Sequence, residues 1–277
     1  MVARARTLES RDVPQVVEFL ERDPSSHLGL LVRLSDGPGW FGRLGQVYGY
    51  FQGRELVAVC QASHNITVSH ASPPALVAFT EKLRYSGGVG SIVGPAEPVL
   101  ALHGLLAERY GGFWSRPRNI RRAQPLMDWV HPSSVAAESS VRLLTTADYP
   151  SYYEASVHMY THEIGVDPRT YGPSYAAGVK RRLSDGLAYG VVREGAVLFK
   201  ADLGLVRGRQ AQIQGVWMDP RLRGRGLAPA AMTGVLELMR DRYPQVSLYV
   251  NDFNAAAIRT YERCGFVQVG TFATVHF

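Results

Sequence analysis

The sequence predicts an α/β protein built from two tandem domains of one fold, because three of its segments recur in the same order. The first is a short strand, a capping aspartate and a helix that starts near a proline. Its five shared positions keep one constant spacing, and they are Arg6, Leu8, Asp12, Pro14 and Glu18 in the first copy and Arg142, Leu144, Asp148, Pro150 and Glu154 in the second. Repetition at a fixed spacing indicates a duplicated unit.

The other two recurrences are a hairpin and the end of a helix. Residues 49–59 resemble residues 189–199, each reading as a strand, a glycine turn and a strand. Residues 108–113 resemble residues 262–266, each ending a helix at a glycine. The sequence therefore predicts domains at residues 1–130 and 141–277, joined by a serine-containing and proline-containing linker near residues 128–140.

Length and charge bound the class of protein. A chain of 277 residues fits one large domain or two ordinary ones. Its net charge of +6 comes from dispersed basic residues, with one cluster at Arg116, Arg118, Arg121 and Arg122. Because no basic face carries interleaved aromatic residues, we do not expect a nucleic-acid partner.

Membrane and disulfide classes are not expected either. No apolar run approaches the roughly 18 residues that a membrane helix needs, and the first residues lack the pattern of a signal peptide. The two cysteines, Cys60 and Cys264, have no metal-ligand spacing and imply no disulfide framework. We therefore expect a cytoplasmic protein without a membrane partner, whose oligomeric state the sequence leaves open.

Hydrophobic periodicity assigns elements to each half in chain order. The first half begins with a helix that ends at Leu20, and later has a strand over residues 65–69 and a helix from Pro73 to Leu83. In the second half, the expected elements are helices over 149–160 and 171–184 with the loop 161–168 between them, a hairpin over 189–199, a strand over 210–218, a helix over 227–242, a strand over 246–250, a helix over 254–264, and two short strands over 266–269 and 271–276.

A glycine-rich and arginine-rich loop joins the strand 210–218 to the helix 227–242. Glycine lets the backbone come close to a bound anion, and the helix start has unpaired N–H groups at the positive end of the dipole. Arginine adds a charge that does not titrate. These features predict an anion site, with the candidate residues Arg221, Arg223, Gly224, Arg225, Gly226, Leu227 and Ala228.

Two familiar nucleotide loops do not match, since the pattern G-x-x-x-x-G-K-[ST] is missing and the glycine spacing is not that of a dinucleotide fold. A tight strand-to-helix turn with solvated arginines is the structural alternative. The loop alone does not decide between that turn and a site for a pyrophosphate.

A second motif downstream decides the interpretation. Residues 254–266 read N-x-x-A-x-x-x-Y-E-x-x-G-F, after a strand and in the order strand, R-x-x-G-x-G, helix, strand. This combination, over about residues 141 to 277, resembles the acyl-CoA-binding half of the GNAT superfamily of N-acetyltransferases. The whole chain is similar to actinobacterial tandem GNAT proteins with an N-terminal domain of unknown function, in part through Gln124-Pro125-Leu126 and the ending 270–277.

The resemblance implies a fold and a coenzyme site. Each domain would be a mixed, mostly antiparallel sheet that splays at one point, with helices on both faces. Acetyl-CoA would be the co-substrate, with no metal. The backbone of Val216, Trp217 and Met218 would pair with the pantetheine arm, the loop Arg221–Ala228 would hold the pyrophosphate, and Asn254 would contact the coenzyme or cap its helix.

The same resemblance implies a catalytic role for Tyr261, whose phenol would protonate the leaving thiolate; an ordinary helix aromatic is the alternative. Many GNAT enzymes carry a glutamate on the central strand, where this chain has Gln210, Gln212 and Gln214. Deprotonation of the amine would then use water, or Glu163 in preference to the adjacent His162. Tyr160 and Trp217 are further acceptor-pocket candidates, with core packing as their alternative.

The first half lacks these groups. At the place of the anion loop it has Pro73 and Pro74, and its third recurrence sets Ala107 against Tyr261 and Leu100 against Asn254. We therefore expect it to have no coenzyme site. The predicted function is acetyl transfer from acetyl-CoA to an unidentified amine, of a small molecule or a protein, with a catalytically silent CoA-binding sensor as the alternative.

Overall fold

The structure is a computed structural model that describes residues 3–35, 46–84, 88–130 and 133–277. It divides into two compact units. Unit 1 comprises residues 1–126, 249–253 and 268–277, and unit 2 comprises residues 127–248 and 254–267. Two stretches that the sequence analysis assigned to the second domain, 249–253 and 268–277, thus belong to unit 1. Of the predicted linker, His131 and Pro132 lie outside the described residues.

Unit 1 is a sheet with helices on two sides. Its elements are β1 (Ala3–Thr7), η1 (Ser10–Asp12), α1 (Val13–Leu20), α2 (Pro24–Ser35), β2 (Gln46–Gln52), β3 (Glu55–Ala62), β4 (Asn65–Val68), α4 (Pro73–Lys82), β5 (Ser91–Pro95) and α5 (Ala96–Tyr110). The strand order is β1-β2-β3-β4-β5-β12, where β12 is Phe266–His276. The pair β4 and β5 is parallel, and the neighbouring pairs are antiparallel.

Unit 2 repeats this arrangement. Its elements are β7 (Arg142–Leu143), η2 (Thr146–Asp148), α6 (Tyr149–Ile164), η3 (Pro168–Tyr171), α7 (Pro173–Ser184), β8 (Ala188–Arg193), β9 (Ala196–Arg207), β10 (Gln210–Met218), η4 (Pro220–Leu222), α8 (Leu227–Met239), β11 (Gln245–Tyr249) and α9 (Ala255–Arg263). The strand order is β7-β8-β9-β10-β11, followed by β6 (Asn119–Trp129). Here β10 and β11 form the parallel pair.

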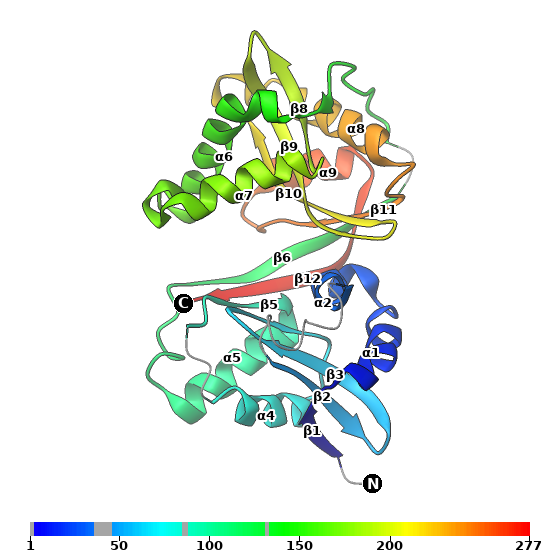
Figure 1. Cartoon of the computed structure of the whole chain (residues 1–277), viewed down its shortest axis with the longest axis vertical. Helices are drawn as coiled ribbons and strands as arrows, with labels where there is room; N and C mark the ends of the chain where they lie inside the picture. Colours follow the sequence, from blue (N-terminus) through cyan, green and yellow to red (C-terminus); the bar gives the residue numbers. More distant parts are fainter. Residues whose placement is uncertain (1–2, 36–45, 85–87, 131–132) are drawn as a thin grey trace. The chain divides into compact units, whose positions relative to one another are not determined.

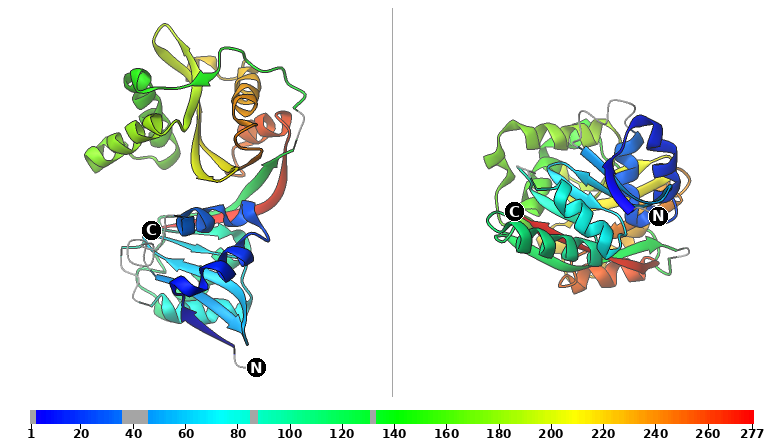
Figure 2. Two further views of the ribbon diagram at one scale, coloured as in Figure 1. Left: turned by 45° about the vertical axis from the view of Figure 1, so that its right-hand side comes forward. Right: turned by 90° about the horizontal axis from the view of Figure 1, so that it is seen from below.

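Alternation along the strands sends side chains to two cores, one on each face of the sheet. In unit 1, Tyr48 packs in the core under α4 and α5, while its neighbour Val47 packs in the core under α1 and α2. In unit 2, α6 and α7 lie on one side of β8–β10 and α8 and α9 on the other (Figure 1), as Figure 2 also shows from a second side. The predicted fold class, mostly antiparallel sheets with helices on both faces, is confirmed for both units.

The first recurrence of the sequence has the same contacts in both copies. In unit 1 the guanidinium of Arg6 donates two hydrogen bonds of 2.7 Å to the carboxylate of Asp12, which also accepts from the Glu9 N–H at 2.8 Å. In unit 2, Arg142 donates to Asp148 at 2.7 and 2.9 Å, and Asp148 accepts from the Thr145 N–H at 2.9 Å. Each aspartate therefore caps a helix start and pairs with the strand before it.

The hairpin recurrence is also present, although the predicted alignment was wrong by one residue. Gly49 pairs with Val59 across the β2–β3 hairpin, and Gly190 pairs with Lys200 across the β8–β9 hairpin. Gly49 therefore corresponds to Gly190, and not to Tyr189. The two-residue turns differ in where the glycine falls, which shifts the match when the letters alone are aligned.

Two helical boundaries and one strand differ from the prediction. The helix predicted to end at residue 160 continues to Ile164 as α6, and the helix predicted to reach residue 242 ends at Met239 as α8. The two short C-terminal strands are one strand, β12, whose residues 272–276 pair with β5 of unit 1. Over the described residues there are eight α-helices, and none of these is long and apolar enough to cross a membrane.

Candidate active site

The loop before α8 has the backbone that the anion-site hypothesis requires. Gly226 is the N-cap of α8 with φ of +73°, and Gly224 has the same φ. A side chain is strained at such angles. A Cβ added at either glycine would meet no atom within 4 Å, so the space beside both is open to a ligand.

The first turn of α8 supplies the donors. Its first N–H groups, those of Leu227 and Ala228, have no acceptor within the helix, and the dipole makes this end positive. Pro229 follows them without an N–H, at a position where the helix tolerates its absence. The loop and the helix start are thus suited to a phosphate group.

Two of the three predicted arginines hold the loop together. Arg221 forms a two-point ion pair with Asp219, with nitrogen–oxygen distances of 3.0 and 2.5 Å, and keeps the pKa of Asp219 at about 2. Arg223 donates from Nε to the carbonyl of Met218 at 3.0 Å. Arg225 is exposed, and its side chain has no ion pair within the described part of the chain. Its guanidinium is the one of the three that can turn fully towards a ligand.

A wedge opens between β10 and β11. The two strands pair only through residues 210–212 of β10 and 245–247 of β11. Beyond that point the chain after β11 bonds to another strand, since the Val250 N–H donates to the Pro125 carbonyl at 3.1 Å. β10 continues alone on this side to Met218. Within the described residues, the edge of β10 from Ile213 to Met218 is therefore left without a strand partner, as a ligand in extended conformation would require.

The same part of β10 contains a bulge. Gln214 pairs with Asp202 and Trp217 pairs with Lys200, so Gly215 and Val216 stand opposite the single residue between that pair on β9. Gly215 lies in the left-handed region with φ of +58°. A glycine adopts this conformation without strain, whereas a residue with a side chain would be strained there. A bulge re-aims the backbone groups next to it.

Trp217 contributes its side chain to the core. It is buried against α6, donates from Nε1 to the Nδ1 of His158 at 3.3 Å, and lies edge-on to that ring. Core packing, the structural alternative for this side chain, is therefore what the structure shows. Tyr160, the other acceptor-pocket candidate, lies edge-on to Tyr175 at a centroid distance of 5.4 Å.

Helix α9 carries Asn254 and Tyr261. Asn254 is the exposed N-cap, and its side-chain oxygen accepts from the Ala257 N–H at 3.2 Å. Tyr261 is buried, with its ring edge-on to Phe266. Burial raises the pKa of Tyr261, and the nearby charge of Glu163 raises it further, so the phenol stays protonated and able to donate.

Glu163 and His162 lie in the last turn of α6, and the predicted loop at these positions was wrong. A left-handed Gly165 ends the helix one turn later than the periodicity suggested. Glu163 is exposed, yet its charge acts on the pKa values of both Tyr261 and Lys200. The structure thus brings Glu163 and Tyr261 into one electrostatic neighbourhood.

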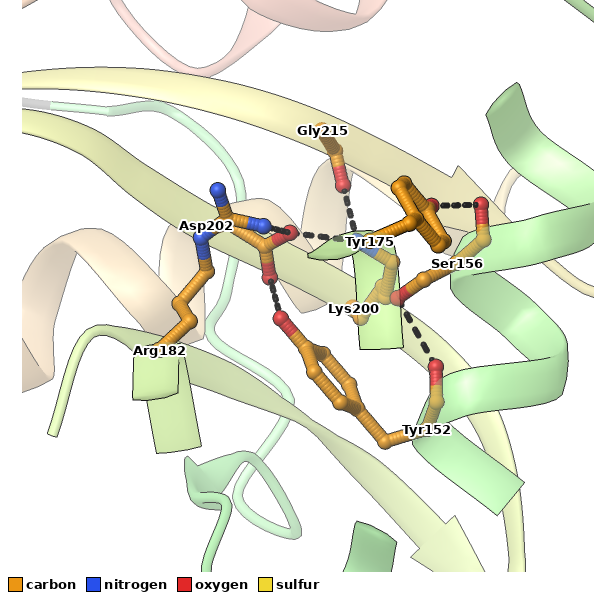
Figure 3. Close-up of polar contacts among 7 residues, drawn as sticks. All are labelled: Tyr152, Ser156, Tyr175, Arg182, Lys200, Asp202 and Gly215. Carbon is orange, nitrogen blue, oxygen red and sulfur yellow. Dashed lines mark hydrogen bonds and ion pairs between the residues drawn. The ribbon is translucent and has the colours of Figure 1, made fainter. Parts of the chain in front are cut away.

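Sequence reasoning missed a buried charged network beside the bulge (Figure 3). Lys200 and Asp202 on β9 are at most 1% exposed and form an ion pair of 2.5 Å. Asp202 also accepts from the Tyr152 hydroxyl at 2.9 Å. Two opposite charges two residues apart, in a strand that is otherwise apolar, were the available signal, because alternation puts both on one buried face.

The central strand provides no carboxylate. Gln212 is buried and accepts a hydrogen bond of 3.1 Å from Gln214, while Gln210 donates to Gln245 at 2.9 Å. An amide cannot take a proton near neutral pH. In the described ranges, moreover, no three histidine, cysteine, aspartate or glutamate residues gather as metal ligands would.

Two family models match the chain. A domain of unknown function, DUF4081, matches residues 45–152, and the acetyltransferase (GNAT) family matches residues 149–266. A mycothiol acetyltransferase from Brachybacterium faecium is 46% identical over 63 residues, which cover 22% of this chain and 19% of that protein. The chain therefore spans about a fifth of the length of this curated relative.

Solved structures show the same fold over nearly the whole chain. A GNAT-family acetyltransferase from Colwellia psychrerythraea has a TM-score of 0.59 at 13% identity, covering 99% of each chain. A tandem GNAT protein from the clavulanic acid biosynthesis pathway has a TM-score of 0.57 at 13% identity, covering 99% of this chain and 98% of its own. Residues 149–266 therefore match the acetyltransferase (GNAT) family in sequence, and the whole chain has the fold of these solved structures.

Proposed function

We propose that unit 2 transfers an acetyl group from acetyl-CoA to an unidentified amine by direct attack. The observation that carries this proposal is the pairing of two features in one unit. The β10 edge ends beside a helix start that is open, positive and bordered by Gly224 and Gly226. An extended pantetheine arm fits the edge, and a pyrophosphate fits the helix start.

The donor would be held by backbone groups along most of its length. Val216, Trp217 and Met218 would offer backbone hydrogen bonds to the amides of pantetheine. The loop from Arg221 to Ala228 would hold the pyrophosphate, with Arg225 as the mobile charge. Asn254 already caps α9, so its contact with the coenzyme would be a second role for the same side chain.

The reaction needs one new C–N bond and one broken C–S bond. The neutral amine would attack the thioester carbonyl, and a strand N–H at the bulge would stabilise the oxyanion. As the C–S bond breaks, the thiolate of CoA would take the proton of the Tyr261 hydroxyl. The attacking nitrogen would lose its extra proton to Glu163, directly or through water, and that proton would return to the tyrosinate through solvent.

The acceptor is an amine of a small molecule or of a protein. The relative named above is a mycothiol acetyltransferase, but the match covers too little of it to transfer that acceptor to this chain. Tyr153, Tyr160 and Tyr175 form ring contacts between α6 and α7, so an acceptor that bound beside these helices would meet aromatic side chains. A panel of amines with aliphatic, aromatic and peptide carriers therefore tests the proposal best.

The experiment measures thiol release from acetyl-CoA against that panel, with the wild type, Tyr261→Phe and Tyr110→Phe. Tyr110 ends α5 in unit 1 and serves as the matched control. We expect turnover on at least one amine, and a kcat about 10²-fold lower in Tyr261→Phe alone, because general-acid catalysis contributes roughly that much. Tight CoA binding with no turnover on any amine, and no effect of Tyr261→Phe, would instead support the CoA-binding sensor.

A further inference from the structure

The bulge in β10 removes the Gly215 carbonyl from the regular ladder. Two residues of β10 face one of β9 there, so this carbonyl needs a donor other than a β9 N–H. The donor is the side chain of Lys200, whose Nζ lies 2.8 Å from the Gly215 oxygen. A buried ammonium group thus takes the place of a backbone donor.

The ammonium is held from the other side. Asp202 receives it at 2.5 Å through Oδ2, and Oδ1 of Asp202 is occupied by the Tyr152 hydroxyl (Figure 3). Arg182 approaches the same carboxylate at 3.4 Å. With four elements converging on it, Lys200 has little freedom to leave the Gly215 carbonyl.

The peptide plane carries this constraint to the next residue. The Gly215 carbonyl and the Val216 N–H belong to one planar trans peptide, in which they point in opposite directions. Fixing the oxygen on Lys200 therefore fixes the N–H on the side away from Lys200. The Lys200 ammonium lies with Asp202 and Tyr152 of α6 on one face of the sheet, so that N–H is turned away from this buried cluster.

We propose that Lys200 is a positioning residue that aims the Val216 N–H at the thioester carbonyl of the donor. This inference rests on the proposed acetyltransferase function. Lys200 does not touch the donor itself, since its side chain is fully buried. It acts through the bulge, and Asp202 acts through Lys200.

A purely structural role is the competing explanation, and it makes a different prediction. Replacing a buried ion pair by apolar residues of similar size often leaves stability unchanged or improves it. If Lys200 and Asp202 only filled the core, Lys200→Met with Asp202→Leu would bind and react like the wild type. If Lys200 aims the Val216 N–H, the same folded protein would lose the hydrogen bond from that N–H to the thioester carbonyl of the donor.

The test compares the wild type, Lys200→Met and the Lys200→Met/Asp202→Leu double variant, with Lys180→Met on the exposed side of α7 as control. The readouts are the Kd values of CoA and of acetyl-CoA, and the kcat on the best amine. We expect the CoA affinity to stay within about threefold, since the pyrophosphate site is untouched. We expect kcat to fall about 10²-fold, as when one oxyanion donor is lost.

The ratio of the two affinities is the specific readout, because a loss of the acetyl contact weakens acetyl-CoA binding and leaves CoA binding in place. If the single variant does not fold, the double variant decides. A folded double variant with kcat within about twofold of the wild type would overturn the inference. A wild type that binds no CoA would overturn the proposed function instead, so the two failures are distinct.

Discussion

In unit 1 the strand β4 ends at Val68, one residue beyond its last pairing with β5, whereas in unit 2 the strand β10 runs six residues beyond its last pairing with β11. The two strands hold the same place in the repeated fold. The Cβ of a side chain at Gly94, on β5, would lie 2.6 Å from the Val68 carbonyl, so the backbones of β4 and β5 stay close at the point where β10 and β11 part. At this place in the sheet, and over the described residues, the free strand edge that an extended ligand needs is therefore present in unit 2 and not in unit 1.

The helices that follow these strands differ in the same sense. Helix α4 of unit 1 begins with Pro73 and Pro74, which lack the N–H groups that an anion would need. Helix α8 of unit 2 begins after Gly226 with Leu227 and Ala228, which keep theirs. The two units therefore share one scaffold. They differ at the end of one strand, β4 or β10, and in the first turn of the helix that follows it, α4 or α8.

Placing a negative charge in each of the two helix starts gives the largest expected difference. Gly226→Asp puts a carboxylate and a strained side chain where the pyrophosphate would bind, and we expect CoA to bind about 10²-fold more weakly, a loss of about 2.7 kcal/mol. Ser72→Asp, at the N-cap of α4, should leave CoA binding unchanged. Isothermal titration of CoA into both variants measures the difference. Unchanged affinity in a folded Gly226→Asp protein would remove the site from α8.

A smaller difference is expected at the paired glycines of the two hairpins. A Cβ at Gly190 would lie 2.4 Å from the Phe199 carbonyl, which is backbone and cannot move aside. A Cβ at Gly49 would meet side-chain atoms, Leu8 Cδ2 at 2.7 Å and Leu56 Cδ1 at 2.8 Å, which can rotate. We expect Gly190→Ala to cost about 3 kcal/mol of unfolding free energy and Gly49→Ala about 1 kcal/mol, within the range for overpacking.

Urea unfolding of the two variants beside the wild type provides the measurement. Equal losses would contradict the view that the backbone contact makes position 190 less tolerant. A larger loss of unfolding free energy for Gly49→Ala would show that the leucine side chains around position 49 cannot rotate to make room for a methyl group.

Much of the scaffold could be predicted from the letters alone, because its signals are local. The capping aspartates Asp12 and Asp148 and the glycine loop before α8 each act within a few residues, and all were found. The bounds of β10 were predicted as observed, since glutamine and apolar residues alternate along it. The acetyltransferase motif placed Tyr261 on a helix next to the correct strand.

The missed features depend on partners that are distant in the sequence. Lys200 donates to Gly215 and Asp202 accepts from Tyr152, and neither contact has a local pattern. The assignment of residues 272–276 to β5 is likewise a matter of long-range pairing. The prediction that Glu163 lies in a loop was wrong for a local reason. The apolar periodicity stops near residue 160, but α6 continues to Ile164 and ends at the left-handed Gly165.

The smallest expected effect concerns pH and the two capping aspartates. Arg142 and the Thr145 N–H lower the pKa of Asp148 to about 2, and Arg6 lowers that of Asp12 in the same direction. A carboxylate whose pKa falls on folding stabilises the protein above its unfolded pKa, near 4, and loses that contribution as the pH drops through the folded value. Because Arg142 is 46% exposed, we expect Asp148→Asn to cost less than about 1 kcal/mol at about pH 6. The difference in urea midpoint between Asp148→Asn and the wild type should become smaller by about pH 3. The Asp12→Asn variant should show the same change. A gap that widened on acidification would contradict the assigned ion pairs, whereas a gap in only one of the two variants would show that the repeated contact stabilises one unit alone.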